Sequence, residues 1–395
     1  MKILYVIGSL DRGGAERHLS YILPSLKKLG YTPHIYTLGR KGSLAPYFTS
    51  QGIEVIHSPL ASFLALQGVC GRLILLVLSA LKLTWIMLRH RYSIVHCFLP
   101  KAYLMGGLCA LVTKRPIRLM SRRSLNHYQL KHPVLKLLEF YLHKRMTAVL
   151  ANSKAVYNDL LSERINVDKL HLLYNGIDLS EYGEITEKSL FRKKLKLDQD
   201  TLFFIIVANL FYYKGHEDLL QALALIKDKL QKPWQLLCVG RDVECLPYYK
   251  KLNEALGLEK HVVWLGERQD IPDYLHATDI GVICSHEEGF SNSVLEGMAA
   301  GLPMVVTQVG GNSEAIHSSA LGRVVPPKSP KDLAAALLEL AQDPKLRAEM
   351  GKAARQRVME CFSLERCIAG YHQLYQSLLN YYCPHIKLDA SSINQ

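Results

Sequence analysis

The sequence predicts an α/β protein with two parallel-sheet domains. Strand-like apolar runs alternate with helical segments along most of the chain, and this alternation is typical of parallel sheets with helices on both faces. The length of 395 residues exceeds what one core usually supports, so two domains are expected. Polar and glycine-containing loops follow several strands, at the ends where such folds bind ligands.

The expected strands divide into two sets, separated by a polar stretch at 180–200 that is typical of a linker. The first set is 2–8, 34–38, 53–57, 93–98, 117–121 and 147–151, and the second is 202–208, 235–239, 262–265, 279–284 and 304–307. We therefore expect domains at 1–180 and 181–362, followed by an amphipathic helix from about Ser363 to Leu379 within a final segment, 363–395.

Composition favours a folded chain in a reducing compartment. Hydrophobic residues make up 49% and charged residues 21% of the chain, which is typical of globular proteins. Nine cysteines are scattered without CxxC pairs, so neither a zinc framework nor a disulfide scaffold is expected. Because the apolar run at 3–7 fits a strand followed by charged residues, no secretory signal and a cytoplasmic location are expected.

Positive charge is concentrated in the first half. Residues 1–180 hold 24 Lys and Arg against 8 Asp and Glu, whereas the remainder holds 24 against 27. This asymmetry favours a polyanionic partner, either anionic lipid or nucleic acid, although a merely solvated basic surface has the same pattern. No nucleic-acid-binding motif accompanies it, so nucleic acid is the weaker alternative.

A nearly apolar segment at 73–88 bears on this choice. Its 16 residues fall short of the roughly 20 that span a bilayer. A buried helix accounts for it, and so does a helix in the membrane interface, anchored by Trp85 and by arginines at both ends. The basic, aromatic-containing stretch 133–145 is a candidate for the same surface.

The strongest chemical signal runs from Glu288 to Glu296. A strand-like run delivers Glu288, a tight loop follows, and a helix is expected to begin near Asn292, a good N-cap residue. The first N–H groups of a helix have no internal partner and carry partial positive charge, so they suit a diphosphate. One loop thus places two carboxylates beside an anion site.

Other strand ends carry further candidates. Gly13 and Gly14 lie between the first strand and its helix, where backbone can approach a phosphate or sugar. Lys214 precedes a helix start, where its ammonium would add to the helix dipole at an anion. The remaining candidates are His96 within a strand, Arg122 after a strand, and Arg268 in a loop that could touch a nucleobase.

Four motifs together resemble the family-4 retaining glycosyltransferases. They are Gly13-Gly14-Ala15-Glu16, Tyr174-Asn175-Gly176-Ile177-Asp178, Lys214-Gly215, and Glu288-Gly289-Phe290-Ser291 through Glu296 to Pro303. The resemblance spans nearly the whole chain. It implies the GT-B fold, in which two Rossmann-like domains face a cleft and a C-terminal helix crosses back onto the N-terminal domain.

The resemblance also implies roles for residues. The second domain would bind a nucleotide-diphosphate sugar, with Lys214 on the diphosphate, Glu288 on the sugar hydroxyls and Glu296 on the ribose. Backbone amides around Phe290, Ser291 and Asn292 would cradle phosphate or sugar oxygens, and the Gly13-Gly14 loop would lie over the diphosphate. No cofactor or metal is implied, since cations and the helix dipole do that work. Transfer with retention, by front-face displacement, is expected.

Two positions depart from the family pattern. Many relatives carry Arg five residues before the lysine, where this chain has Asn209. Many also carry His after the fifth strand, where this chain reads Ser121-Arg122-Arg123. Either Arg122 acts near the reacting centre, or the first domain takes a different, anionic acceptor.

The expected function is hexosyl transfer to a lipid-linked oligosaccharide or to a lipopolysaccharide or cell-surface polysaccharide precursor. The expected location is peripheral, at the inner face of the cell membrane and in contact with anionic lipid. A soluble acceptor and a nucleotide-sugar epimerase of similar fold are the alternatives.

Overall fold

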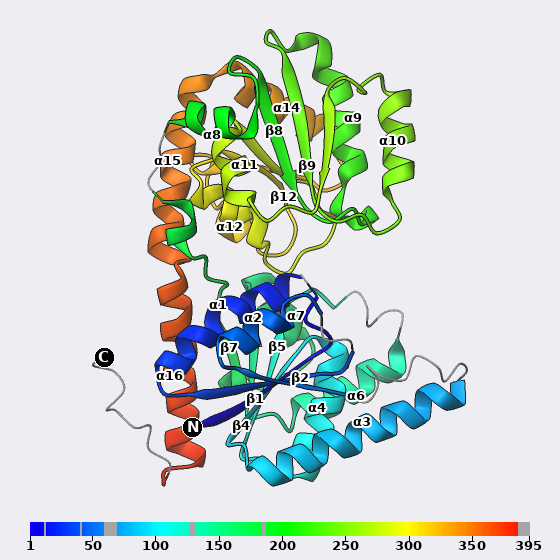
Figure 1. The fold of residues 1–395 in the computed structure, drawn as a ribbon, viewed down its shortest axis with the longest axis vertical. Coiled ribbons are helices and arrows are strands. Elements are labelled where there is room, and N and C mark those ends of the chain that lie inside the picture. Colours follow the sequence, from blue (N-terminus) through cyan, green and yellow to red (C-terminus); the bar gives the residue numbers. More distant parts are fainter. Residues whose placement is uncertain are drawn as a thin grey trace. The chain divides into compact units, whose positions relative to one another are not determined.

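A computed structural model describes residues 1–11, 13–39, 42–58, 69–126, 129, 132–183 and 187–385. The chain forms two compact units, Met1–Gly176 with Leu364–Gln395, and Ile177–Ser363 (Figure 1). Each unit is built around one parallel sheet, so the predicted α/β architecture with two sheets is confirmed.

The first unit contains a seven-stranded sheet in the order β3-β2-β1-β4-β5-β6-β7. The strands are β1 (Lys2–Ile7), β2 (Thr32–Thr37), β3 (Glu54–His57), β4 (Ile94–Phe98), β5 (Ile117–Arg122), β6 (Ala148–Ala151) and β7 (Leu170–Leu172). The helices are α1 (Gly14–Lys28), α2 (Ala45–Ser50), α3 (Val69–His90), α4 (Pro100–Val112), α6 (Pro133–His143), α7 (Lys154–Ser162) and α16 (Leu364–Tyr382). The short strand β7 was not predicted.

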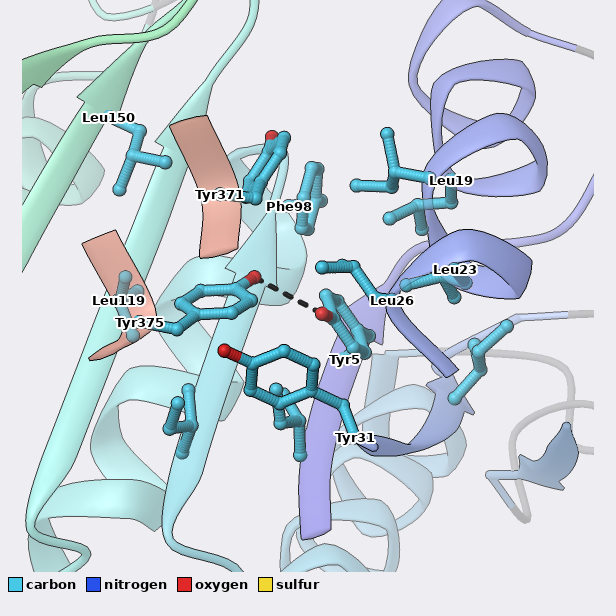
Figure 2. Packing of buried hydrophobic residues seen from close by; sticks show 14 of the residues in the cluster. Tyr5, Leu19, Leu23, Leu26, Tyr31, Phe98, Leu119, Leu150, Tyr371 and Tyr375 are labelled. Atoms are coloured by element: carbon cyan, nitrogen blue, oxygen red, sulfur yellow. Dashed lines mark hydrogen bonds between the residues drawn. The ribbon is translucent and has the colours of Figure 1, made fainter. Parts of the chain in front are cut away.

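Two layers of helices cover the first sheet. One core joins the sheet to α1, α2 and α16, and the other joins its opposite face to α3, α4, α6 and α7. The last helix therefore packs on the first sheet, as the fold expectation requires. Figure 2 shows this contact, in which the hydroxyls of Tyr5 on β1 and Tyr375 on α16 share a hydrogen bond of 3.1 Å among buried apolar side chains.

The second unit contains a six-stranded sheet in the order β10-β9-β8-β11-β12-β13. The strands are β8 (Leu202–Val207), β9 (Trp234–Val239), β10 (Val262–Gly266), β11 (Ile280–Ile283), β12 (Met304–Thr307) and β13 (Gly322–Val325), the last of which was not predicted. The helices are α8 (Lys188–Leu195), α9 (His216–Ile226), α10 (Leu246–Ala255), α11 (Ile271–Ala277), α12 (Asn292–Ala299), α13 (Asn312–Ala315), α14 (Pro330–Gln342) and α15 (Pro344–Cys361).

The strand order identifies where each unit can bind a ligand. In the second unit the order reverses between β8 and β11, and in the first it reverses between β1 and β4. A crevice opens at such a switch point, outside the carboxyl ends of the two strands. The loops that carry Lys214 and Glu288 follow β8 and β11, and the loop that carries Gly13 follows β1.

Candidate active site

The ammonium of Lys214 and the carboxylate of Glu288 form an ion pair at the switch point of the second sheet. Lys214 Nζ lies 2.6 Å from Glu288 Oε1, and both side chains are largely buried. Burial alone would lower the pKa of Lys214, but the Glu288 carboxylate outweighs it, and the pKa is raised. Lys214 is therefore charged at neutral pH, as electrostatic binding of a phosphate requires.

The loop after β8 is shaped so that Lys214 meets the loop after β11. Gly215 adopts φ +73°, and a Cβ there would lie 2.0 Å from the carbonyl oxygen of Cys284. Only glycine tolerates both this conformation and this approach. Gly215 also caps α9, so Lys214 stands directly before the positive end of a helix.

Neighbouring contacts hold Glu288 in place. Ser285 Oγ donates to Glu288 Oε1 at 2.8 Å. The N–H of Gly311 donates to the carbonyl of Gly289 at 2.7 Å. Gly310 has φ +50°, and a Cβ there would lie 2.1 Å from the Glu288 carbonyl oxygen, so both its conformation and this close approach require glycine. The loop after β12 thus supports the turn that carries Glu288.

A hydrogen bond between His286 and Asp218 links the loop after β11 to the first turn of α9. His286 Nε2 lies 2.7 Å from Asp218 Oδ2 on α9, and the His286 N–H donates to the Tyr213 carbonyl at 2.7 Å. Neither His286 nor Asp218 is among the candidates that the sequence suggests. The alternation of strand and helix would have placed Asp218 in the first turn after Lys214, but not its partner, which lies 68 residues away.

Helix α12 begins at Asn292, four residues after Glu288, but its N-cap differs from the predicted one. The N-cap is Ser291 rather than Asn292, and its side chain makes no capping hydrogen bond to the helix. Phe290 is buried against Phe362, with ring centroids 5.4 Å apart, which anchors the loop before the helix. Glu296 lies one turn inside α12 and is 1% exposed. Glu288 thus precedes the helix start and Glu296 follows it within the first turns of α12, as the spacing predicted.

The Asn209 side chain links the loop after β8 to the loop after β9. The second of these loops carries Arg241, which was not predicted as a site residue. The Arg241 N–H donates to Asn209 Oδ1 at 3.0 Å, and the Arg241 carbonyl accepts from the Leu210 N–H at 3.0 Å. Arg241 has an exposed side chain and follows β9, the neighbour of β8. The signal that could have found it is a cation directly after Gly240, at the end of an adjacent strand.

Arg268 lies farther along the same sheet edge, after β10. Its guanidinium makes two hydrogen bonds to the Asp270 carboxylate, at 3.0 and 2.8 Å, and lies over the Tyr274 ring at 5.2 Å. This pair orients the arginine within its own loop and leaves its side chain partly exposed. Its expected contact with a nucleobase stays a prediction.

In the first unit, Gly13 and Gly14 begin α1 directly after the β1 loop. A Cβ on Gly13 would lie 2.5 Å from Glu16 Oε2, so the glycine makes room for that carboxylate. Burial raises the pKa of Glu16 to about 7, and nearby Arg123 partly opposes this rise. Arg123 Nη2 in turn donates to Asn175 Oδ1 at 2.6 Å. Glycine at position 13 therefore leaves room for the Glu16 side chain, in addition to letting the backbone approach a ligand.

Arg122 lies buried among charged side chains of the first unit, an arrangement that favours a structural role. Its side chain is 1% exposed and bonds Glu163 Oε1 and, at 3.1 Å, Glu139 Oε2. His143 Nε2 also contacts Glu163, at 2.9 Å. Glu139, His143 and Glu163 are the one group of described residues whose donor atoms lie close enough to hold a metal, and there the Arg122 guanidinium supplies the positive charge.

His96 is likewise a core residue. Its Nδ1 shares a hydrogen bond of 2.7 Å with the Tyr375 hydroxyl, and its Nε2 shares one of 2.8 Å with Ser121 Oγ. The ring is fully buried, and burial lowers its pKa to about 3. Both ring nitrogens are thus engaged inside the unit, and a contact of His96 with the donor stays a prediction.

The fold and the site define a glycosyltransferase of the GT-B class. Residues 187–357 match a family profile described as "Glycosyl transferases group 1", and residues 12–181 match one described as "Glycosyltransferase Family 4". Because the two matches together cover most of the chain, the chain belongs to this glycosyltransferase family.

Several curated relatives are named as bacterial glycosyltransferases. The chain is 28% identical to the N-acetyl-alpha-D-glucosaminyl L-malate synthase of Bacillus anthracis over 57% of this chain and 59% of that protein, so it spans about three fifths of that relative. It is 24% identical to the UDP-Gal:alpha-D-GlcNAc-diphosphoundecaprenol alpha-1,3-galactosyltransferase of Escherichia coli, over 75% of this chain and 78% of that protein.

A solved structure supports the fold. The Anabaena protein Alr3699/HepE, crystallised in complex with UDP and glucose, aligns with a TM-score of 0.82 over 95% of this chain and 100% of that chain, at 21% identity. At this identity the likeness establishes a shared fold alone.

Proposed function

We propose that the protein transfers a hexose-type sugar, with retention, from a nucleotide-diphosphate sugar to a lipid-linked oligosaccharide or a lipopolysaccharide or cell-surface polysaccharide precursor. The observation that carries this proposal is the 2.6 Å pair of Lys214 and Glu288 at the switch point of the second sheet. A cation for the diphosphate and a carboxylate for sugar hydroxyls are thereby fixed side by side.

Lys214 stabilises the leaving group in this reaction. Negative charge grows on the diphosphate as the glycosidic bond breaks, and a fixed ammonium in a largely buried site stabilises that charge. The start of α12 adds backbone N–H groups and helix dipole. Glu288 accepts hydrogen bonds from the sugar, and Glu296 binds the ribose hydroxyls.

Arg241 supplies a second cation for the diphosphate, in place of the arginine that many relatives carry at the position of Asn209. Asn209 holds the Arg241 backbone beside the loop that leads to Lys214, and the exposed guanidinium is able to reach toward bound phosphate. Arginine suits this task because its planar donors match phosphate oxygens.

No divalent metal is needed in this proposal, because Lys214, Arg241 and the helix start supply the positive charge. Departure of the diphosphate on the face that the acceptor enters gives retention, and a phosphate oxygen takes the acceptor proton. Addition of a chelator should therefore leave the transfer rate unchanged.

Two features favour a lipid-linked acceptor over a soluble one. The E. coli relative is named for a diphosphoundecaprenol substrate. The first half of this chain also carries the excess of positive charge, which suits a diphosphate-bearing acceptor at an anionic membrane. We therefore place the enzyme at the inner membrane face as a peripheral protein. No helix among the described residues is long and apolar enough to cross a bilayer.

A donor screen tests the proposal. Thermal shift with UDP, GDP and their sugars identifies the nucleotide, and nucleotide release is then measured with each stabilising donor and a lipid-linked acceptor. The proposed enzyme releases nucleotide only as sugar is transferred, and NMR of the product retains the anomeric configuration of the donor. An epimerase would convert the nucleotide sugar without releasing nucleotide.

A further inference from the structure

The outer surface of three helices in the first unit is unusually apolar. Helix α4 packs against both α3 and α6, and all three belong to the layer that covers one face of the sheet (Figure 1). We call the outward side of these helices the α3–α4–α6 surface.

Helix α3 is apolar on both of its sides. Its inward side buries Leu75, Leu83 and Met87 against the unit. A soluble helix normally has a polar opposite side. The opposite side of α3 instead exposes large apolar residues at helical spacing: Ile74, Val77, Leu78, Leu81, Trp85 and Leu88. Leu81 and Trp85 are 60% and 58% exposed.

The neighbouring helices extend this apolar exposure. On α6, Val134, Leu137 and Tyr141 are exposed at spacings of three and four residues, and Val134 reaches 75%. On α4, Leu108 and Val112 are exposed one turn apart. Exposed apolar side chains on three helices that pack side by side are typical of an interaction surface.

The charge of the same region has one sign. Residues 69–145 contain 14 Lys and Arg residues and a single acidic residue, Glu139. Glu139 is fully buried and paired with Arg122, so it contributes no negative charge to the surface. The exposed charges of this stretch, among them Lys101, Lys114 and Lys144, are therefore all positive.

Two helices place an arginine over an exposed aromatic ring. Arg89 lies over the Trp85 ring at 5.8 Å on α3, and Arg145, two residues after the end of α6, lies over the ring of Tyr141 on α6 at 3.6 Å. Aromatic rings of this kind settle at the headgroup level of a bilayer, and arginines extend from apolar surface toward phosphates. The pairs therefore combine the two anchors that an interfacial helix uses.

We propose that the α3–α4–α6 surface docks the protein on an anionic lipid bilayer. The apolar side chains enter the boundary between headgroups and acyl chains, and the surrounding Lys and Arg residues bind lipid phosphates. This inference deepens the proposed function by naming the surface that meets the membrane, but lipid binding is measurable without any sugar transfer.

A second copy of the chain fits this surface less well. In a two-fold contact the same basic residues would face one another, and no acidic residue of 69–145 lies on the surface to offset them. An anionic bilayer instead complements both the apolar residues and their positive surroundings. The charge therefore favours lipid over self-association.

Flotation of the full-length protein with lipid vesicles tests this inference. We expect the protein to float with vesicles that contain phosphatidylglycerol and to float poorly with phosphatidylcholine alone. The double variant Leu81→Glu/Trp85→Glu should weaken vesicle binding by about tenfold or more, since it removes buried apolar area and adds repulsion. Arg89→Glu/Arg145→Glu should reduce the preference for anionic lipid.

The matched control is Leu225→Glu on α9, a leucine that is 50% exposed in the second unit. It should float like the wild type. Donor-induced thermal shift should be equal in all variants, which verifies folding and separates lipid docking from donor binding.

Three results would overturn the inference. The wild type could remain unbound with both vesicle types, or Leu81→Glu/Trp85→Glu could float as well as the wild type. Alternatively, sedimentation could reveal a dimer that this variant abolishes without any change in vesicle binding. Failure of sugar transfer with intact vesicle binding would instead count against the proposed function alone.

Discussion

Lys214 Nζ and Glu288 Oε1 lie 2.6 Å apart although 74 residues separate them in the chain. They meet because β8 and β11 are adjacent and parallel, and each residue follows the carboxyl end of its strand. Two loops that are unrelated in sequence thus supply one cation and one carboxylate to a single site.

Replacing Lys214 should slow the chemical step. Lys214→Ala removes a charge that stabilises the departing diphosphate, so kcat should fall by about 10²–10³-fold. Steady-state kinetics with the donor from the screen measures this. Lys214→Arg should recover part of the rate, and an alanine variant with wild-type kcat would remove Lys214 from the mechanism.

Replacing Glu288 and replacing Glu296 should change different kinetic constants. Glu288→Gln should lower kcat, because the carboxylate acts next to the reacting sugar, whereas Glu296→Gln should mainly raise KM for the donor by weakening ribose binding. Kinetics of both variants, with calorimetric titration of the free nucleotide, separates the effects. If Glu296→Gln impairs kcat more than nucleotide affinity, the assigned roles are reversed.

Arg241 should contribute to diphosphate binding. Arg241→Ala should weaken nucleoside-diphosphate binding by about tenfold, the effect of losing one charge-assisted hydrogen bond. Lys250→Ala, at an exposed cation on α10, is the control and should bind normally. Equal affinities for the two variants would show that Arg241 is only surface charge.

Arg122 should matter for folding and not for the reaction. Arg122→Ala leaves Glu139 and Glu163 buried without their cation, which should cost about 3–5 kcal/mol of unfolding free energy. Urea denaturation measures this loss. Protein that remains folded at low temperature should keep the kcat of the wild type. A stable variant with lost activity would restore the catalytic interpretation.

His96 should make the first unit sensitive to acid. Its pKa is about 3 in the folded chain and about 6.5 in an unfolded one, so the unfolded state binds a proton first as pH falls below 6.5. Stability is unaffected above that pH and should decrease by about 2 kcal/mol by pH 5. Other groups also titrate between pH 7 and pH 5, so the contribution of His96 is measured by comparing the wild type with a variant that lacks the titrating ring.

The matched variant is His96→Gln, which keeps polar atoms but does not titrate. Between pH 7 and pH 5, it should lose about 2 kcal/mol less than the wild type in denaturant titrations. Identical losses would mean that the ring is protonated in the folded protein.

Local sequence was sufficient to predict the loop and helix start between Glu288 and Glu296. The run before Glu288, the turn and the helix start all lie within about 20 residues, and parallel-sheet topology then places Lys214 opposite. The strands β7 and β13 were missed because three or four residues are too few to establish a period.

Residues whose partners are distant in sequence could not be assigned. Arg122 looked like a strand-end cation because its partners, Glu139 and Glu163, lie 17 and 41 residues away. His96 looked available because Tyr375 lies 279 residues away on the last helix. Burial and pairing of such groups depend on tertiary packing, which no local pattern encodes.

The most direct measurement is nucleotide release from the identified donor with and without a lipid-diphosphate-linked acceptor, for the wild type and for Lys214→Ala. Acceptor-dependent release of nucleotide, matched by glycosylated product and lost by about 10²-fold or more in the variant, is the predicted result. Turnover of the donor without nucleotide release, or equal release by both proteins, would contradict a glycosyl transfer centred on the pair of Lys214 and Glu288.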